Sequence, residues 1–210
     1  MLASVYAPKD FKRLRASGDI VARCFDFISP HIRAGISTGE IDRMVAAFLK
    51  ENGARSSDLG YHGYPKHICT SVNDVIVHGI PSDEVILKDG DIVSVDVVAD
   101  KKGYHGDACR TFCIGAVAPE VRQLVKVTEE CFFKAIEGLR AGSELYDIGY
   151  AVQQHAESHG YGVIRSYTGH GIGREMHEDP SVPNFGKLGT GMRLKAGMVL
   201  CIEPMIALGS

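Results

Sequence analysis

The sequence contains an internal repeat, which constrains the fold more than any other feature. When the chain is shifted by 107 residues against itself, matching residues align in one register from residue 24 to residue 96, without a gap. The matches include Cys24 with Cys131, Arg33-Ala34-Gly35 with Arg140-Ala141-Gly142, Ile41 with Ile148, Val45 with Val152, Gly53 with Gly160, Leu87 with Leu194, and Gly90 with Gly197. Chance hardly produces all of these in one register. We therefore interpret the chain as two copies of one unit, at about residues 1–115 and 116–210.

Each copy is predicted to begin with two helices and to continue in antiparallel strands. Apolar residues at helical spacing predict a helix over residues 8–32, and Ser37 with Glu40 is typical of a capping box that begins the next helix. The second copy repeats this pattern at 119–140 and 143–159. Strands are expected at 91–98 and 104–114. The whole chain is thus predicted to have an α+β fold with pseudo-two-fold symmetry.

Composition narrows the class of protein. The 210 residues contain 23 Lys and Arg against 26 Asp and Glu, so the basic excess of a dedicated nucleic-acid binder is absent. No apolar run approaches the roughly 20 residues of a membrane span, and the N-terminus lacks a secretory signal pattern. The six cysteines form no Cys-x-x-Cys pair, which argues against a zinc ribbon and favours reduced thiols. We expect a cytoplasmic monomer that contacts neither nucleic acid nor membrane.

Two acidic residues occupy equivalent positions in the repeat. Asp96 aligns with Glu203, and each ends an apolar stretch. One such acid is more often a satisfied side chain at a strand end, but two at equivalent positions favour a metal site, because a buried carboxylate needs a cation or partner. If residues 100–103 form a hairpin turn, Asp107 lies directly opposite Asp96, with Cβ atoms about 5 Å apart. One metal ion or a pair would remove their repulsion, although a one-residue slip would separate the two acids onto opposite faces.

Histidines supply the remaining candidate chemistry. Glycines flank His170, and we expect them to let the backbone approach a ligand closely. His78 and His177 lie in loop-like sequence. Oxygen ligands with one imidazole suit Mn, Fe, Co or Zn. The pair His155 and His159 differs from the His-Glu-x-x-His motif of zinc proteases in the position of its glutamate, so we predict a solvated helix face there.

These motifs together resemble the type I methionine aminopeptidases in their short bacterial form, over nearly all 210 residues. The similar segments are 60–65 (GYHGYP), 78–81 (HGIP), 91–96 (DIVSVD), 104–107 (YHGD), 169–173 (GHGIG) and 202–205 (IEPM). The resemblance implies a pita-bread fold that forms a single catalytic domain over residues 1–210. It implies up to two divalent metal ions (Co, Mn, Fe or Zn), held by Asp96, Asp107, His170 and Glu203. The implied reaction removes the N-terminal methionine from peptides and nascent proteins with a small second residue, and the ribosome is a further candidate partner.

The resemblance also implies roles for other side chains. His78 and His177 contact the substrate or the tetrahedral intermediate and are catalytic together with Glu203. Tyr61, Tyr64, Cys69 and Met176 line the pocket for the methionine side chain. The family often has an apolar residue or cysteine at position 58, where this chain has an aspartate that is costly if buried.

Two alternatives remain open from the sequence. One is a prolidase-like X-Pro aminopeptidase, against which the single short domain counts, and the other is a catalytically impaired binding protein on the same scaffold. The family has a fifth ligand, a glutamate on a strand after Glu-Pro-Met, and the repeat would place the counterpart of Asp107 beyond Ser210. We therefore expect a second half that is incomplete at its C-terminal end, with an exposed strand edge, weak metal binding and weak activity.

Overall fold

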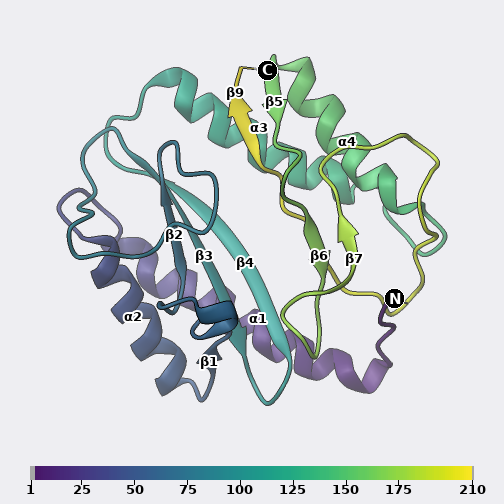
Figure 1. The fold of residues 1–210 in the computed structure, drawn as a ribbon, viewed down its shortest axis with the longest axis horizontal. Coiled ribbons are helices and arrows are strands. Elements are labelled where there is room, and N and C mark those ends of the chain that lie inside the picture. Colours follow the sequence, from purple (N-terminus) through teal and green to yellow (C-terminus); the bar gives the residue numbers. More distant parts are fainter. Residues whose placement is uncertain (1–2, 210) are drawn as a thin grey trace. The chain divides into compact units, whose positions relative to one another are not determined.

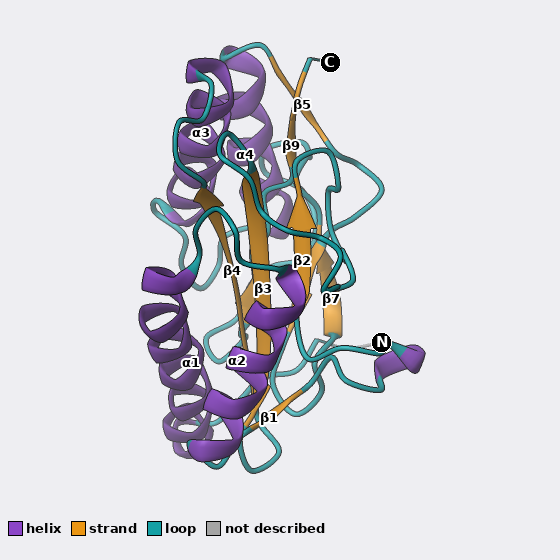
Figure 2. Ribbon diagram, turned by 90° about the vertical axis from the view of Figure 1, so that its left-hand side faces the viewer, coloured by secondary structure: helices purple, strands orange, loops and turns teal. Residues whose placement is uncertain are grey.

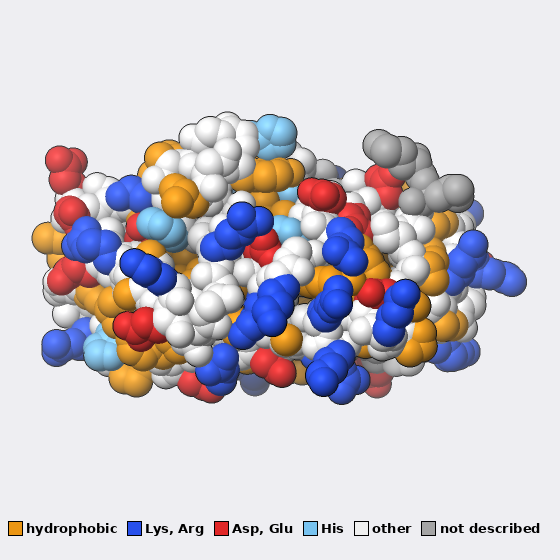
Figure 3. Space-filling model, turned by 90° about the horizontal axis from the view of Figure 1, so that it is seen from below, with side chains coloured by type: hydrophobic (Ala, Val, Ile, Leu, Met, Phe, Trp, Pro, Cys, Tyr) orange, Lys and Arg blue, Asp and Glu red, His pale blue; other side chains and the backbone are white. Residues whose placement is uncertain are grey.

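The computed structural model describes residues 3–209 and divides them into two compact units. The N-terminal unit comprises residues 9–118 and 174–176, and the C-terminal unit comprises residues 3–8, 119–173 and 177–209. The main division falls between Ala118 and Pro119, close to the boundary that the repeat predicts. Within residues 3–209, no helix combines the length and the apolarity that crossing a membrane requires. Figure 3 shows lysine and arginine side chains over one face, with carboxylates and apolar side chains between them.

The N-terminal unit packs two helices against one antiparallel sheet. Its helices are α1 (Pro8–Ile28) and α2 (Thr38–Glu51), with short 3-10 turns at Ser29–His31 and Tyr61–Gly63. Its strands are β1 (Arg55–Ser56), β2 (Cys69–Val72), β3 (Ile92–Asp100) and β4 (His105–Cys113). The long strand β3 pairs with β4 along one edge and with β1 and β2 along the other (Figure 1).

The alternation along β3 decides which face of this sheet is the core. Val93, Val95 and Val97 are fully buried against apolar side chains of α1 and α2, which lie on one side of the sheet in Figure 2. Burial of each such valine stabilises the fold by roughly 1.5–3 kcal/mol. Since successive side chains of a strand point to opposite faces, Ser94 and Asp96 lie on the other face, away from this core.

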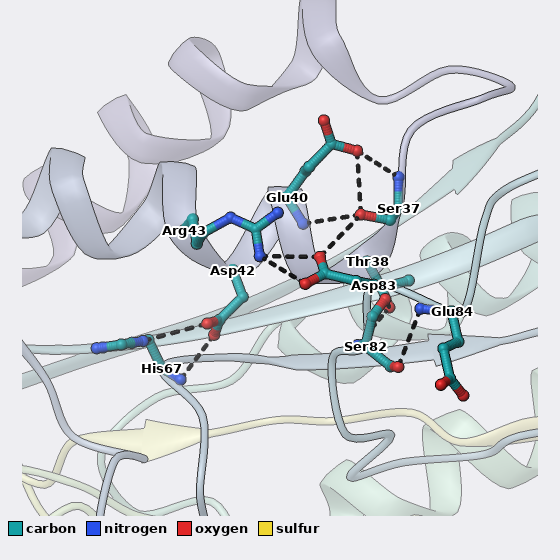
Figure 4. A network of polar contacts seen from close by, with 9 residues as sticks. All are labelled: Ser37, Thr38, Glu40, Asp42, Arg43, His67, Ser82, Asp83 and Glu84. Carbon is teal, nitrogen blue, oxygen red and sulfur yellow. Dashed lines mark hydrogen bonds and ion pairs between the residues drawn. The ribbon is translucent and has the colours of Figure 1, made fainter.

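A polar network fixes the start of α2 and the segment before β2 (Figure 4). The Ser37 side chain accepts a hydrogen bond from the Glu40 amide at 3.1 Å and the Glu40 carboxylate accepts one from the Ser37 amide at 3.0 Å, so the predicted capping box is confirmed. The buried Asp42 accepts a 2.7 Å hydrogen bond from the backbone amide of His67. This bond ties the segment leading into β2 to α2, and so positions Cys69.

The C-terminal unit repeats the order of helices before strands. It contains α3 (Pro119–Ile136), α4 (Leu145–Ser158), β5 (Tyr161–Val163), β6 (Gly169–Gly171), β7 (Glu178–Val182), β8 (Leu200–Cys201) and β9 (Ile206–Leu208). Strand β6 pairs with both β7 and β8, and β5 pairs with β9. The two helices pack on each other through side chains with no exposed surface, including Val127, Cys131, Ile148, Val152 and Ala156.

The sequence repeat is a structural repeat. The Gly35 amide donates to the Leu87 carbonyl at 2.8 Å, and the equivalent Gly142 amide donates to Leu194 at 2.8 Å. Strand pairing follows the same offset, because Arg55 pairs with Asp100 while Gly162 pairs with Ala207. The expected α+β architecture of two similar halves is therefore confirmed.

Element boundaries differ from the prediction where local chemistry intervenes. Helix α1 ends at Ile28 and not at residue 32, because Pro30 has no amide proton and its ring would clash with the preceding turn. In the second copy, α3 ends at Ile136 and α4 begins at Leu145, so both helices are shorter than the predicted ranges 119–140 and 143–159. Asp96 lies in the middle of β3 and not at a strand end.

The predicted register of the β3–β4 hairpin is wrong by two residues. Asp100 pairs with His105, so four residues form the loop, and the Asp100 side chain accepts a 2.7 Å hydrogen bond from the Gly103 amide. Lys102 and Gly103 take positive φ angles of 57° and 75°. Such a loop is stabilised by its aspartate, which a count of turn residues alone does not reveal. Asp96 consequently pairs with Cys109, and Asp107 with Val98.

Candidate active site

The acids of the N-terminal unit share the face of the sheet that is turned away from the core. A slip of two residues preserves the face, so Asp96 and Asp107 are diagonal neighbours and not directly opposed. Cys69 on β2 pairs with Asp96 from the other edge of β3. Burial, together with the negative charges of Asp58, Asp96 and Asp107, raises the pKa of the Cys69 thiol to about 12. Three acidic side chains are therefore near enough to this thiol to help keep it protonated.

Asp58, the third of these acids, has a raised pKa. Burial raises the pKa of its carboxyl from the ordinary 3.8 to about 7, and the charge of Asp107 adds to the shift. Its Oδ2 atom is buried and has no hydrogen-bond partner among the described residues. The structure thus agrees with the expectation that burial of an aspartate at this position costs free energy.

His170 lies in β6 between two glycines, and these glycines serve the sheet. A Cβ atom on Gly169 would lie 2.2 Å from the Cys201 carbonyl oxygen, and one on Gly171 would lie 2.4 Å from that of Asp179. The glycines therefore permit β6 to pass between its neighbours, and the expected approach of backbone to a ligand is not needed to explain them. His170 itself is buried, and its Nδ1 atom is 2.8 Å from the Gly171 carbonyl oxygen. Since a carbonyl only accepts, Nδ1 carries the proton and Nε2 has the lone pair of the neutral ring.

Glu203 faces this lone pair. Its Oε1 atom lies 3.1 Å from His170 Nε2, yet Oε1 is buried and accepts no hydrogen bond of acceptable geometry within residues 3–209. Cys201 pairs with His170 across β6 and β8, and the three side chains each offer a ligand atom within 4.8 Å of the others. Two acceptors this close repel unless a proton or a metal ion lies between them, and the imidazole, thiol and carboxylate together form a group that could hold a divalent transition metal.

His177 accompanies His170 in the C-terminal unit. The two imidazole rings are 4.2 Å apart between centroids and meet edge to face at 63°. The next residue, Glu178, accepts a 2.5 Å hydrogen bond from the Tyr6 hydroxyl. This bond holds the segment that presents His177.

The other residues implied in substrate binding belong to the N-terminal unit. The Tyr64 hydroxyl is 3.1 Å from the carbonyl oxygen of Gly79, and burial raises its pKa, as does its hydrogen bond to Cys69. Gly79 lies so close to β2 that a Cβ atom there would be 2.2 Å from the Thr70 carbonyl oxygen. His78 precedes it with a φ angle of 60°, a strained conformation for a residue with a side chain.

The side chains predicted to line the pocket differ in how far they are buried. Cys69 and Met176 are 6% and 5% exposed, whereas Tyr61 is 38% exposed and packs edge to face on His62. Tyr61 is therefore a rim residue of this group.

Cys201 is the candidate ligand that the sequence did not reveal. Its repeat counterpart is Ser94, a polar residue two positions before Asp96. The spacing of two residues could have predicted Cys201 as a ligand, because alternate residues of a strand lie on the same face.

Comparison with known proteins assigns the fold to a family. The model of metallopeptidase family M24 matches residues 12–209. The chain belongs to this family. The methionine aminopeptidase of Clostridium acetobutylicum is 47% identical over 201 residues, which are 96% of this chain and 80% of that protein. The crystal structure of methionine aminopeptidase from Rickettsia prowazekii superimposes with a TM-score of 0.97 at 44% identity, covering 100% of this chain and 84% of that one.

More distant M24 structures share the pita-bread fold at lower similarity. An Xaa-Pro dipeptidase from Bacillus anthracis gives a TM-score of 0.83 at 26% identity and covers 95% of this chain but 54% of that one. The comparisons thus favour a methionine aminopeptidase relationship over the prolidase alternative. Membership of M24 implies use of divalent metal, and the carboxylate and imidazole groups described above are suited to it.

Proposed function

We propose that the protein removes the N-terminal methionine from peptides and nascent proteins with a small second residue, by metal-dependent hydrolysis. Relatives named methionine aminopeptidase, at 47% and 44% identity over nearly the whole chain, support this reaction. The observation that carries the chemistry is Glu203 Oε1, buried without a hydrogen bond and 3.1 Å from His170 Nε2. A cation is the simplest partner for both atoms.

We propose Asp96, Asp107, His170 and Glu203 as the ligands of up to two divalent ions, with Co, Mn, Fe and Zn as candidates. When bound, such ions polarise a carbonyl and lower the pKa of water to about 7. His170 contributes a fixed tautomer through the bond of its Nδ1 atom to Gly171. Asp96 is proposed to lie near the α-amino group of the substrate, which restricts cleavage to N-terminal residues.

Three further side chains complete the proposed catalytic set. His177 and His78 contact the substrate and stabilise negative charge that develops on the carbonyl oxygen. Glu203 takes up a proton during hydrolysis. A thiol with a pKa of about 12, as at Cys69, stays neutral, and with Met176, Tyr61 and Tyr64 it suits an unbranched thioether side chain.

The test is methionine release from Met-Ala-Ser, measured by amino-acid analysis with and without a chelator. We expect release to stop after metal removal and to return on adding Mn²⁺ or Co²⁺. His170→Ala should lower kcat/KM at least about 100-fold, since even the partners of metal ligands affect activity 10- to 100-fold. His31→Ala, a change of an exposed histidine in the 3-10 turn after α1, is the matched control. Undiminished release in His170→Ala, or after exhaustive chelation, contradicts the proposal.

The same assay separates the alternatives. Hydrolysis of Ala-Pro with no cleavage of Met-Ala-Ser would identify an X-Pro peptidase, and stoichiometric peptide binding without turnover would identify a binding protein. We further propose that the protein acts in the cytoplasm as a monomer, on chains emerging from the ribosome. Gel filtration and co-sedimentation with ribosomes test these two points.

A further inference from the structure

A second group of potential metal ligands lies on the helices of the C-terminal unit, outside the proposed active site. Glu130 extends from α3, His155 extends from the last turns of α4, and His159 is the residue that caps α4. Each of the three offers a ligand atom, and these atoms all lie within 4.8 Å of one another. The proposed hydrolysis of peptides uses none of them.

The core beneath this group holds its backbone in place. Cys131, which follows Glu130, is fully buried, and its thiol is 3.6 Å from the Val152 carbonyl oxygen of α4. Ala156, which follows His155, is fully buried in the same core. The positions from which Glu130 and His155 extend are therefore fixed by packing, and not by the polar contact between them.

The side chains already converge without a metal. His155 Nε2 lies 2.9 Å from Glu130 Oε2, and the rings of His155 and His159 are 4.7 Å apart between centroids. A bound metal ion would take the place of the proton between His155 Nε2 and Glu130 Oε2, because a histidine nitrogen binds a metal only through its lone pair. Lys126 approaches the other oxygen, Oε1, at 3.7 Å and leaves Oε2 to His155.

The orientation of His159 suits ligation. Its Nδ1 atom lies 2.9 Å from the His155 carbonyl oxygen, which only accepts hydrogen bonds, so Nε2 has the lone pair of the neutral ring. In metal sites, the ring nitrogen that does not bind the metal usually donates a hydrogen bond of this kind, which fixes the tautomer and the orientation of the imidazole. The residue is exposed, so an ion could reach it directly from solvent.

We propose that Glu130, His155 and His159 form a binding site for a transition-metal ion such as Zn²⁺, Ni²⁺ or Cu²⁺, which joins α3 to the end of α4. Two imidazoles and one carboxylate are a ligand set that these ions accept, with water in the remaining positions. Ligand atoms about 2.0–2.1 Å from one tetrahedral zinc ion lie about 3.4 Å apart, so these side chains, whose ligand atoms are within 4.8 Å of one another, must draw together by up to about 1.4 Å. The helix face of His155 and His159, which the sequence predicted to be solvated, would thus also bind a metal ion.

The experiment measures zinc binding to the full chain in a His170→Ala background, so that the proposed active site contributes less. Isothermal titration calorimetry with Zn²⁺ should give one more bound ion per chain in this background than after the further change His159→Ala. Glu130→Gln should weaken the same binding event by about tenfold or more. His31→Ala should leave it unchanged, which controls for the loss of any exposed histidine.

Two further readouts keep the inference independent of the hydrolytic site. Zinc should raise the melting temperature of the His170→Ala protein, and this rise should disappear with His159→Ala. In the otherwise unchanged protein, His159→Ala should not alter methionine release. Equal zinc stoichiometry and equal thermal shifts with and without His159 would overturn the proposed site.

Discussion

Asp58 gives the most quantitative test of the acidic face. Its carboxyl has a pKa of about 7, against 3.8 ordinarily, chiefly because it is buried. A folded-state pKa above the unfolded value means that the native state holds its proton when the unfolded chain has lost it. Stability should therefore fall as the pH rises from about 4 to about 7 and should level off above.

The size of the effect follows from the same shift. About 3 pKa units correspond to roughly 4 kcal/mol across the whole range, at about 1.36 kcal/mol for each unit. Between pH 5 and pH 8 the expected loss from Asp58 alone is about 2.5 kcal/mol. Asp58→Asn removes this titrating group. Any change in the free energy of unfolding that comes from packing of the amide is the same at both pH values and so cancels from the comparison.

The assay is urea denaturation of the chelated protein and of Asp58→Asn at pH 5 and pH 8. The variant should gain about 2.5 kcal/mol relative to the original protein on going from pH 5 to pH 8. The control is Asp83→Asn. The Asp83 pKa is held below its ordinary value by the hydrogen bond from Arg43, so this group is ionised in both states over that range. A stability difference for Asp58→Asn that does not change with pH would refute the assignment of a buried carboxyl with a raised pKa.

Further substitutions test the neighbouring contacts. Asp107→Ala should lower metal affinity more than His78→Ala in a calorimetric titration, because His78 is assigned to the substrate, and equal losses would contradict that division. Gly106→Ala should destabilise the protein by at least about 1–3 kcal/mol, since its Cβ would lie 2.5 Å from the Gly18 backbone nitrogen of α1. Gly18→Ala, with nothing within 4 Å of its Cβ, should instead stabilise α1 by about 1 kcal/mol in the same thermal melts.

The sequence predicted those parts of the fold that depend on local pattern. The four long helices and the capping box at Ser37 follow from periodicity and spacing, which act within a few residues. The hairpin register did not follow, because the Asp100 side chain, and not a two-residue turn, determines the loop. The repeat predicted a strand that ends at Glu203, but β8 comprises only Leu200–Cys201 and has too few side chains to show alternation. The other short strands of the C-terminal unit were not predicted.

The sequence predicted which residues form the candidate site better than it predicted how they contact one another. The acids Asp96 and Glu203 were found because the repeat superimposes them. The contact of Glu203 with His170 depends on the pairing of β6 with β8, which is long-range and leaves no local pattern. The pKa of Asp58 likewise depends on burial by residues distant in sequence, so its cost could be expected but not its size.

The repeat also separates structural from chemical residues. Positions that hold the backbone are matched in both halves: the Gly35 and Gly142 amides make equivalent bonds, and Gly53 and Gly160 follow equivalent helices. Positions assigned to chemistry are matched only in part, because Asp96 aligns with the acid Glu203 whereas His170 aligns with Gly63. Since the backbone frame is shared, each half could change its polar side chains without changing its fold. Besides acids shared by both copies, functional residues should then be sought where the copies have the same backbone and differ in polar side chains. His159 is such a position, because its counterpart Asn52 ends α2 in the same way.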